Sequence, residues 1–592
     1  MEGHCSPPWE LLTGELVERV ASLLPPNEVA CTMRLINKST ARQLRGWTLV
    51  RLSQPAPHHA FVRRWGTERG MRDLSLQQRQ QLLCLTARSG VIANLDIAIA
   101  AVGCPLTKQV STAAVEAGHL EMCDWLVEPE RGCPLDAEAA AKAAAKAGNM
   151  TALCWVLQRA GAHDPATRKA AAQKALLLAA RGGHRALCEE LLPVVENPYL
   201  EEAVWRAAEG GHEDLVYWLL DELDKLRVEI EHKELLMSAV YGFELSALQR
   251  LFDFRLGSMV VDEYEEFKED SGWHLVAAAI ASPGSDWRAK LEWLDAEGIH
   301  MQEGGLEQFM WLDMLDWEPL PKLVDAVERV VLLREQRLMA PRATAGLCSS
   351  AIAVSSLPVV QLLLSAEGAL GSDDDMVAAA AEVGNVDVLL QLLATGLPMT
   401  LNAAKRAARR GHLHVLQRLL LEGPDAVGPA AAAAAAEVLQ AALQDPGLMK
   451  CGAESGSLEM VVWLRERGCP WDADAFEGAA DSGNAAMLEW MAAQGCPMGS
   501  TGEAYLKAGR NGDFATLRCL RRLGCPWGPD SSTFNRAIYN GGNNNECNAP
   551  YCSLPVLSWL VTEGCPVNWH EARVMAALRE DEEVRAWVES NP

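Results

Sequence analysis

Cysteines and histidines are the residues of this chain whose side chains could bind a metal ion or act as nucleophile and base. The 592 residues include 17 cysteines and 13 histidines. Six cysteines share one position, the middle of the tripeptide G-C-P: Cys104, Cys133, Cys469, Cys496, Cys525 and Cys565. Equivalent positions of neighbouring stacked helices lie about 8–10 Å apart. This separation is too large for a disulfide or a shared metal, so we expect these cysteines to be small packing residues.

The nearest approach to a metal-binding pair is Cys547 with Cys552, in an Asn-rich insertion at residues 540–552. A structural zinc site needs four ligands, and the sequence offers no second pair beside them. The chain contains no G-x-x-x-x-G-K-[ST], H-E-x-x-H or G-x-S-x-G pattern. The sequence therefore predicts a protein that is not an enzyme, with no catalytic residue, cofactor or metal.

These side chains belong to a repeat whose turn carries a glycine. The glycine recurs, with an apolar residue five and eight positions later, at Gly118, Gly148, Gly183, Gly211, Gly384, Gly411, Gly456, Gly483 and Gly512. In one unit, Asp472 precedes an alanine-rich stretch, Gly483 interrupts it, and Met487 and Met491 resume the helical spacing. The pattern predicts a helix-turn-helix unit, with a left-handed glycine and a His or Asn that starts the next helix. We expect the tryptophan seven residues after the glycine to lie in the core.

Length and charge agree with an array. A chain of this length is too long for one hydrophobic core, and self-similar helix pairs predict an all-α solenoid. The net charge of −26 argues against nucleic acid as a partner, because backbone binding needs a basic stripe. The first ninety residues differ, because they contain an arginine-rich patch: Arg42, Arg45, Arg51, Arg63, Arg64, Arg69 and Arg72. We expect this patch to face solvent; the alternatives are that it contacts an acidic partner or folds back onto the acidic array. No leader and no long apolar span is present, so we expect an intracellular protein, cytoplasmic or nuclear, without a transmembrane segment.

The repeats resemble the ankyrin family. The resemblance rests on the A-x-x-G-H turn near residues 115–119, 207–212 and 407–412 and on the V-x-x-L-L helix at 415–420, and it covers most of residues 76–592. G-C-P replaces the family's Thr-Pro-Leu-His, and the clearest units repeat every 27 to 30 residues, against about 33 in ankyrin. The resemblance implies shortened fingers and an unidentified protein ligand on the concave helical face.

The N-terminal residues resemble the F-box family. The spacing of six residues around Pro25-Pro26 follows the pattern L-P-x-E-L-L-x-x-I-x-x-x-L-P-x-x-D-L: Leu12, Leu16, Val20, Leu24, Glu28 and Val29. Thr13 replaces the family's proline, and Glu28 its aspartate. The resemblance implies docking to a Skp-type adaptor of a cullin ubiquitin ligase through Leu16, Val20 and Leu24. The alternative is a cap that buries this face against the first repeat.

Together these patterns predict an all-α, ankyrin-like helical-repeat solenoid with shortened fingers, preceded by a small helical F-box-like segment. The expected parts are an F-box-like segment at 1–45, an Arg-rich linker at 46–75, ankyrin-like repeats at 76–254, degenerate helical repeats with an acidic insertion at 255–350, and ankyrin-like repeats with poly-Ala and Asn-rich insertions at 351–592. The predicted function is a non-catalytic protein–protein interaction scaffold. One alternative is an F-box substrate receptor. A lower alternative is a relation to sphingomyelin phosphodiesterases, which short ankyrin-like units with G-C-P exits resemble.

Overall fold

The computed structural model describes residues 12–228, 230–256, 272–300, 320–323, 325–335, 341–364, 374–421, 429–539, 551–579 and 581–591. The acidic run at 262–270, the start of the poly-Ala insertion at 426–428 and the Asn-rich residues 540–550, with Cys547, lie outside these ranges. In the described residues every regular element is a helix. None of the helices there is long and apolar enough to cross a membrane.

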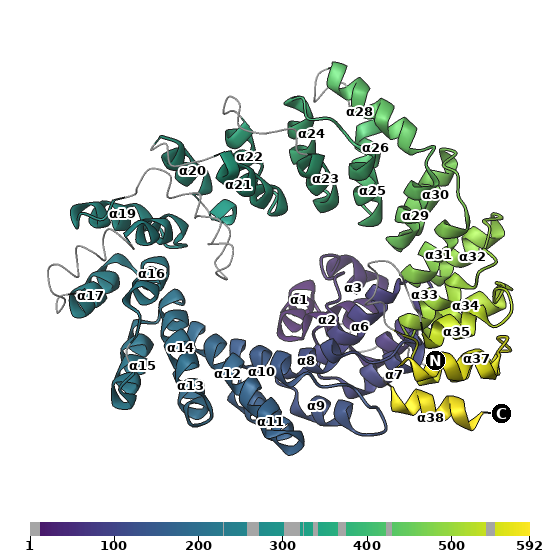
Figure 1. Cartoon of the computed structure of the whole chain (residues 1–592), viewed down its shortest axis with the longest axis horizontal. Helices are drawn as coiled ribbons and strands as arrows, with labels where there is room; N and C mark the ends of the chain where they lie inside the picture. Colours follow the sequence, from purple (N-terminus) through teal and green to yellow (C-terminus); the bar gives the residue numbers. More distant parts are fainter. Residues whose placement is uncertain are drawn as a thin grey trace, which may run out of the picture. The chain divides into compact units, whose positions relative to one another are not determined.

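The chain divides into two compact units. Unit 1 joins Met1–Val156 with Asp472–Pro592, and unit 2 is Leu157–Trp471, so unit 1 is built from two distant segments of the chain. Helix pairs make up both units (Figure 1).

The helices of unit 1 are α1 Gly14–Leu23, α2 Pro26–Cys31, η2 Met33–Leu35, α3 Lys38–Gln43, α4 His58–Trp65, α5 Glu68–Met71, α6 Leu76–Arg88, α7 Ile92–Val102, α8 Lys108–Ala117, α9 Leu120–Val127, α10 Ala137–Lys146, α31 Ala473–Ser482, α32 Ala485–Ala493, α33 Glu503–Arg510, α34 Phe514–Arg522, α35 Ser532–Ile538, α36 Leu554–Thr562, α37 Trp569–Ala577 and α38 Glu582–Ser590. Helix α11, Met150–His163, runs from unit 1 into unit 2.

The helices of unit 2 are α12 Pro165–Arg181, α13 Arg185–Leu191, η3 Leu192–Val194, α14 Asn197–Glu209, α15 Glu213–Leu226, α16 His232–Gly242, α17 Leu245–Leu256, α19 Trp287–Ala296, η5 Leu320–Lys322, α20 Ala326–Glu335, α21 Pro341–Ala353, α22 Leu357–Leu364, α23 Asp374–Val383, α24 Val386–Ala394, α25 Leu401–Arg409, α26 Leu413–Leu421, α28 Pro429–Ala442, α29 Pro446–Glu454 and α30 Leu458–Glu466.

The turn glycines have the predicted left-handed conformation. All nine have φ between 63° and 82°, a region that costs other residues about 1–2 kcal/mol. The following residue behaves differently in two groups of repeats. Asn385 and Asn484 accept a hydrogen bond from a backbone N–H of the next helix, as an N-cap does. His119 and His212 make no such bond.

The histidines instead join one repeat to the repeat before it. The Nε2 atoms of His119, His212 and His412 lie 3.1, 3.1 and 2.9 Å from the carbonyl oxygens of Arg88, Arg181 and Glu382, at the ends of the preceding first helices. Each ring also lies against the turn glycine of the preceding repeat, which is Gly90, Gly183 or Gly384. The expected helix-starting role of these histidines is therefore corrected to a bond between repeats.

Small residues let the first helices stack in a row. Helices α6, α8 and α10 contact one another in sequence, as do α12, α14 and α16, and α31, α33, α35 and α37. In α10 the inward positions are alanines, and all four are fully buried: Ala140, Ala141, Ala144 and Ala145. The recurring tryptophans lie further out than expected, because Trp463 is buried whereas Trp125, Trp155, Trp218 and Trp490 are half-buried.

Four of the six G-C-P cysteines close a second helix, each by a bond from its N–H to the carbonyl five residues earlier: Cys469, Cys496, Cys525 and Cys565. The N–H of Cys469, for example, donates to the carbonyl of Leu464 after a left-handed Gly468, which is a Schellman ending. All six thiols are free and buried, which confirms the packing role. Burial raises the pKa of the Cys525 and Cys565 thiols to about 12, so both stay protonated at neutral pH.

In helices α19 and α20, where the repeats lack the glycine and histidine, buried cations bond the preceding helices. Lys290 Nζ of α19 donates to the Val240 carbonyl at 3.0 Å, and Arg329 of α20 donates to the Ser282 carbonyl at 2.7 Å. Both side chains are almost fully buried, and each pairs with an aspartate four residues earlier. Burial lowers the pKa of Lys290. These cations satisfy helix-end carbonyls, as the histidines do elsewhere.

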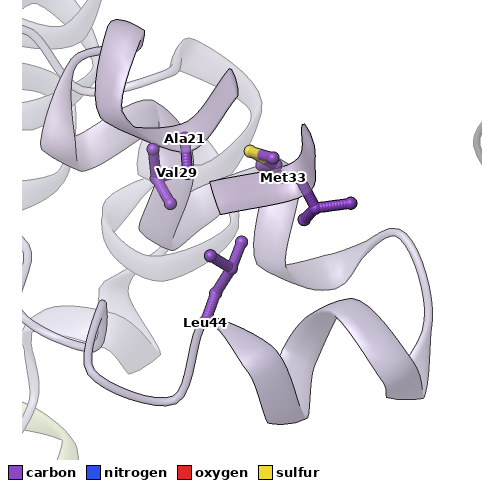
Figure 2. Packing of buried hydrophobic residues seen from close by; sticks show 5 residues of the cluster. Ala21, Val29, Met33 and Leu44 are labelled. Carbon is purple, nitrogen blue, oxygen red and sulfur yellow. The ribbon is translucent and has the colours of Figure 1, made fainter. Parts of the chain in front are cut away.

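The N-terminal helices α1, α2, η2 and α3 share a small core of their own. Val17, Ala21, Val29, Met33 and Leu44 are buried together, and Figure 2 shows Val29, Met33 and Leu44 converging on it. A buried amide fixes the chain that follows, because Asn27 Nδ2 donates to the carbonyls of residues 51, 54 and 55.

A glycine can be required for its left-handed backbone or for the close approach of a neighbouring side chain. Gly183→Ala and Gly468→Ala separate these two requirements. Both glycines are left-handed, but a Cβ at Gly183 would lie 2.5 Å from the His212 ring, whereas a Cβ at Gly468 meets nothing within 4 Å. We expect Gly468→Ala to lower the free energy of unfolding by about 1 kcal/mol and Gly183→Ala by roughly 1–3 kcal/mol more. Urea denaturation of both variants checks this. Equal losses would contradict the contact between repeats.

Aspartate caps should make unfolding sensitive to acid. Asp136, Asp164 and Asp581 accept backbone N–H bonds at helix starts, and these bonds lower the carboxyl pKa below its usual 3.8. Their stabilisation is complete above the unfolded pKa and is lost as the pH falls through the lower folded pKa. The triple Asp→Asn variant keeps the caps, so we expect its urea midpoint to fall less between pH 5 and pH 3 than that of the parent. An unchanged acid response would contradict this account.

Candidate anion-binding site of unit 1

The two segments of unit 1 meet along a seam, which we define as the contacts of residues 68–103 with residues 483–522. Two backbone bonds cross it, from Ala486 N to the Arg72 carbonyl and from Ala515 N to the Gly103 carbonyl, both 3.1 Å long. The donors belong to the first turns of α32 and α34, whose N–H groups have no partner inside the helix. The N-terminal segment therefore satisfies the starts of two C-terminal helices.

A buried ion pair lies inside the seam. Arg79 donates to both carboxylate oxygens of Asp513, at 2.9 and 2.6 Å, and also to the carbonyls of Val102 and Gly483 at 2.7 and 2.9 Å. The two side chains are only 2% and 1% exposed. Asp513 also caps α34 by accepting from Thr516 N and Oγ1. A charge pair taken this far from water needs such complete bonding.

Above the ion pair, a cavity of about 260 Å³ opens along the seam. Its charged lining residues are five arginines and two glutamates: Arg69, Arg72, Arg79, Arg518, Arg522, Glu68 and Glu489. Buried Met71 and Cys519 add apolar surface. Asp513 neutralises Arg79, so the remaining four arginines and two glutamates leave two positive charges in excess. Ala485 and Ala515, in the first turns of α32 and α34, also line the cavity.

Two guanidinium groups of the cavity meet at one carboxylate. Arg72, from the N-terminal segment, and Arg522, from α34, both form ion pairs with Glu489. Arg518 pairs with Glu68 at 3.8 Å, and both of these side chains are more than half exposed, which makes their pair weak. The cavity thus already holds one anionic group, its own Glu489, between two arginines.

The cysteine of the cavity is not a nucleophile. Cys519 is buried, and burial raises the pKa of its thiol to about 11 although the nearby Arg522 acts to lower it. The thiol is therefore protonated at neutral pH, and a thiolate is what attacks. Among the described residues, no group of three or more His, Cys, Asp or Glu could hold a metal ion.

A basic segment leads up to the cavity. Between Glu28 and Glu68 the chain has seven arginines and lysines and no acidic residue. We call residues 34–72 the basic segment. Most of its cations are exposed and, within the described residues, have no ion-pair partner: Lys38, Arg42, Arg45, Arg51, Arg63 and Arg69. Elsewhere exposed arginines such as Arg185 and Arg250 pair with glutamates.

An aromatic ring stands in the basic segment. The Arg64 guanidinium lies 4.1 Å from the centre of the Trp65 ring and donates to the Gly70 carbonyl at 3.0 Å. A second cavity, of about 360 Å³, is lined by Phe61, Arg63, Arg64 and Trp65 with smaller apolar residues. Helices α4 and α5, which carry these residues and Arg69, contact each other.

The six residues of the expected F-box-like site do not form one exposed face. Val29 is buried, and Leu12, Val20 and Leu24 pack half-buried against the N-terminal core. Leu16 is 46% exposed, and Glu28 is half-buried. A binding role for these positions is not tested by their placement and stays a prediction.

The sequence placed Arg69 and Arg72 of the seam in the arginine-rich patch but missed the buried ion pair, although each residue of that pair carries a signal. Arg79 occupies the buried face of α6 beside Leu76, Leu82 and Leu83, where an arginine needs a partner. Asp513 is the one aspartate among the nine residues that follow the turn glycines. Neither signal names the other residue, because 434 positions separate the two.

No family model matches the chain, and no curated protein matches it. Solved structures of a pentatricopeptide repeat protein, PPR10, do match. The crystal structure of PPR10 from maize is 12% identical, with 99% of this chain and 97% of that chain covered and a TM-score of 0.25. PPR10 in complex with an 18-nt psaJ RNA element is also 12% identical, with 98% of each chain covered and a TM-score of 0.20.

These comparisons correct the family resemblances drawn from the sequence. The matching structures are pentatricopeptide repeat proteins, and neither the ankyrin nor the F-box assignment is supported. Any stacked helix pair can have a left-handed turn glycine, a first helix of small residues and an apolar second helix. The pattern therefore identified helix pairs and did not identify a family. The ankyrin scaffold, the F-box receptor with its Skp-type adaptor and the phosphodiesterase relation are withdrawn with it.

The exclusion of nucleic acid was wrong as well. The charge of −26 is an average over unequal parts of the chain. The first ninety residues hold 12 arginines and lysines against 7 aspartates and glutamates, a net charge of +5. A local basic surface is what a phosphate backbone meets, so the average charge cannot decide this question.

Arg79→Met tests the buried ion pair. Removing one partner leaves an uncompensated buried charge, and we expect the free energy of unfolding of unit 1 to fall by about 3–5 kcal/mol. Adding Asp513→Asn should restore part of this loss, because asparagine keeps the α34 cap and carries no charge. Chemical denaturation followed by circular dichroism measures both effects. A double variant less stable than Arg79→Met alone would contradict the pairing.

Proposed function

We propose that unit 1 binds single-stranded RNA through its basic segment. The observation that carries the proposal is the row of exposed cations at residues 38–69 that lack ion-pair partners among the described residues. Leaving so many like charges unpaired costs stability through mutual repulsion. A polyanion that releases counterions on binding would offset this cost.

The aromatic content of the segment favours a single strand. Trp65 presents a ring beside Arg63 and Arg64 at the second cavity. Bases of a single strand stack on aromatic rings and guanidinium planes, while arginines follow the phosphates. Bases inside a duplex are already stacked on each other, so they gain nothing from such a ring.

The rest of the chain limits where the strand can lie. Residues outside the first ninety carry a net charge of −31, the difference between −26 and +5. This charge repels a phosphate backbone except where arginines gather. We therefore place the strand on the N-terminal segment of unit 1 and its neighbouring cations of α34.

Salt-dependent binding of RNA tests the proposal. We would measure the fluorescence anisotropy of a labelled single strand of about 16 nucleotides, the upper site size of a small single-strand binding module. Each lost phosphate contact should reduce the slope of log K against log salt by about 0.7. The Arg63→Gln, Arg64→Gln variant should therefore bind more weakly and lose roughly 1.4 from that slope.

A matched control has the same charge change in unit 2. Arg185→Gln, Arg250→Gln removes two exposed arginines whose partners are Glu189 and Glu213. This variant should bind RNA like the parent. RNA binding that does not respond to salt, or that falls equally in both double variants, would show the basic segment is not the binding surface.

A further inference from the structure

The seam cavity is lined by cations of both segments of unit 1. Its lining has two positive charges in excess once Arg79 is neutralised by Asp513. A backbone phosphate diester has one negative charge, whereas a terminal phosphomonoester has about −1.5 to −2 at pH 7. The volume of about 260 Å³ lies just below the usual range of about 300–1,000 Å³ for drug-sized ligands. Charge and volume together suit one small dianionic group.

Two arginines of the cavity already converge on one carboxylate. Arg72 and Arg522 come from segments 450 positions apart in sequence numbering and bind the same Glu489 carboxylate. Arginine forks bind carboxylates and phosphates in the same bidentate manner. Arg69 of α5 is exposed at the same cavity and has no ion-pair partner in the described part of the chain.

We propose that the seam cavity of unit 1 binds a phosphomonoester dianion, and specifically the 5′-phosphate of the RNA strand. Arg69, Arg72, Arg518 and Arg522 donate to its oxygens, and Glu489 competes with it for Arg72 and Arg522. The inference rests on the proposed function only for the source of the phosphate. A phosphorylated small molecule would offer the same group.

Neighbouring arginines of α34 supply a matched pair of variants. Arg522 lines the cavity and is 63% exposed, whereas Arg521 points to Glu563 at 3.8 Å and does not line it. Arg522→Gln and Arg521→Gln thus remove the same charge from the same helix. Glu489→Gln removes the competing carboxylate and raises the excess charge of the lining by one. Thermal unfolding without ligand shows whether each full-length variant is folded.

The experiment compares strands that differ only at the 5′ end. We expect the 5′-phosphorylated strand to bind about tenfold more tightly than the 5′-hydroxyl strand, a difference of one charge-assisted hydrogen bond. The ratio should fall to near one in Arg522→Gln, persist in Arg521→Gln and increase in Glu489→Gln. Inorganic phosphate should raise the midpoint of thermal unfolding of the parent and of Arg521→Gln, relative to chloride at equal ionic strength, and leave Arg522→Gln unchanged.

The outcomes separate the two proposals. A ratio of one in the parent, with salt-dependent RNA binding intact and no effect of inorganic phosphate, overturns the phosphate site and leaves the proposed function. Stabilisation by inorganic phosphate that requires Arg522, without any RNA binding, supports the phosphate site and overturns RNA as the source. Equal loss of the ratio in Arg521→Gln and Arg522→Gln overturns the assignment to the cavity.

Discussion

A guanidinium and a carboxylate removed from water must bond each other fully, and this constraint shapes unit 1. Arg79 uses its donors on Asp513 and on two helix-end carbonyls, while Asp513 also caps α34. The pair closes a loop of 434 residues, which costs roughly 5 kcal/mol of chain entropy in addition to a constant term. An ion pair alone does not offset that cost. The backbone bonds of the seam and the stacked first helices must contribute the rest.

Cations of both segments collect at the cavity of the seam. Arg69 and Arg72 come from the N-terminal segment, and Arg518 and Arg522 come from α34. Within the array, arginines are held by glutamates of adjacent helices, as in Arg250 with Glu213. At the seam there are too few carboxylates for the arginines present, so the surface has a charge that the fold itself does not use. This excess is what makes the cavity a candidate site.

Local sequence patterns predicted the helix pairs, but they did not predict which distant segments of the chain contact each other. Gly183, Gly483 and the G-C-P cysteines behave as their local conformation demands, because a left-handed turn and a Schellman ending involve only a few neighbouring residues. His212 was misassigned because its partner carbonyl belongs to the preceding repeat. The region around Lys290 lacks the glycine and histidine of the other repeats, so its repeats looked degenerate in the sequence. There a buried cation, in place of a histidine, bonds a carbonyl at the end of a preceding helix. The contact of Arg79 with Asp513 could not be derived, since no local pattern states which distant segment a buried arginine will meet.

Unit 2 is an insertion between the two segments of unit 1, and this order has a consequence for biosynthesis. A ribosome that has added Arg79 must add 434 further residues to reach Asp513. At about 5–20 residues per second this takes roughly 20–90 s. During this interval Arg79 of α6 lacks its carboxylate partner Asp513. Unit 1 is therefore necessarily completed after unit 2 has been synthesised.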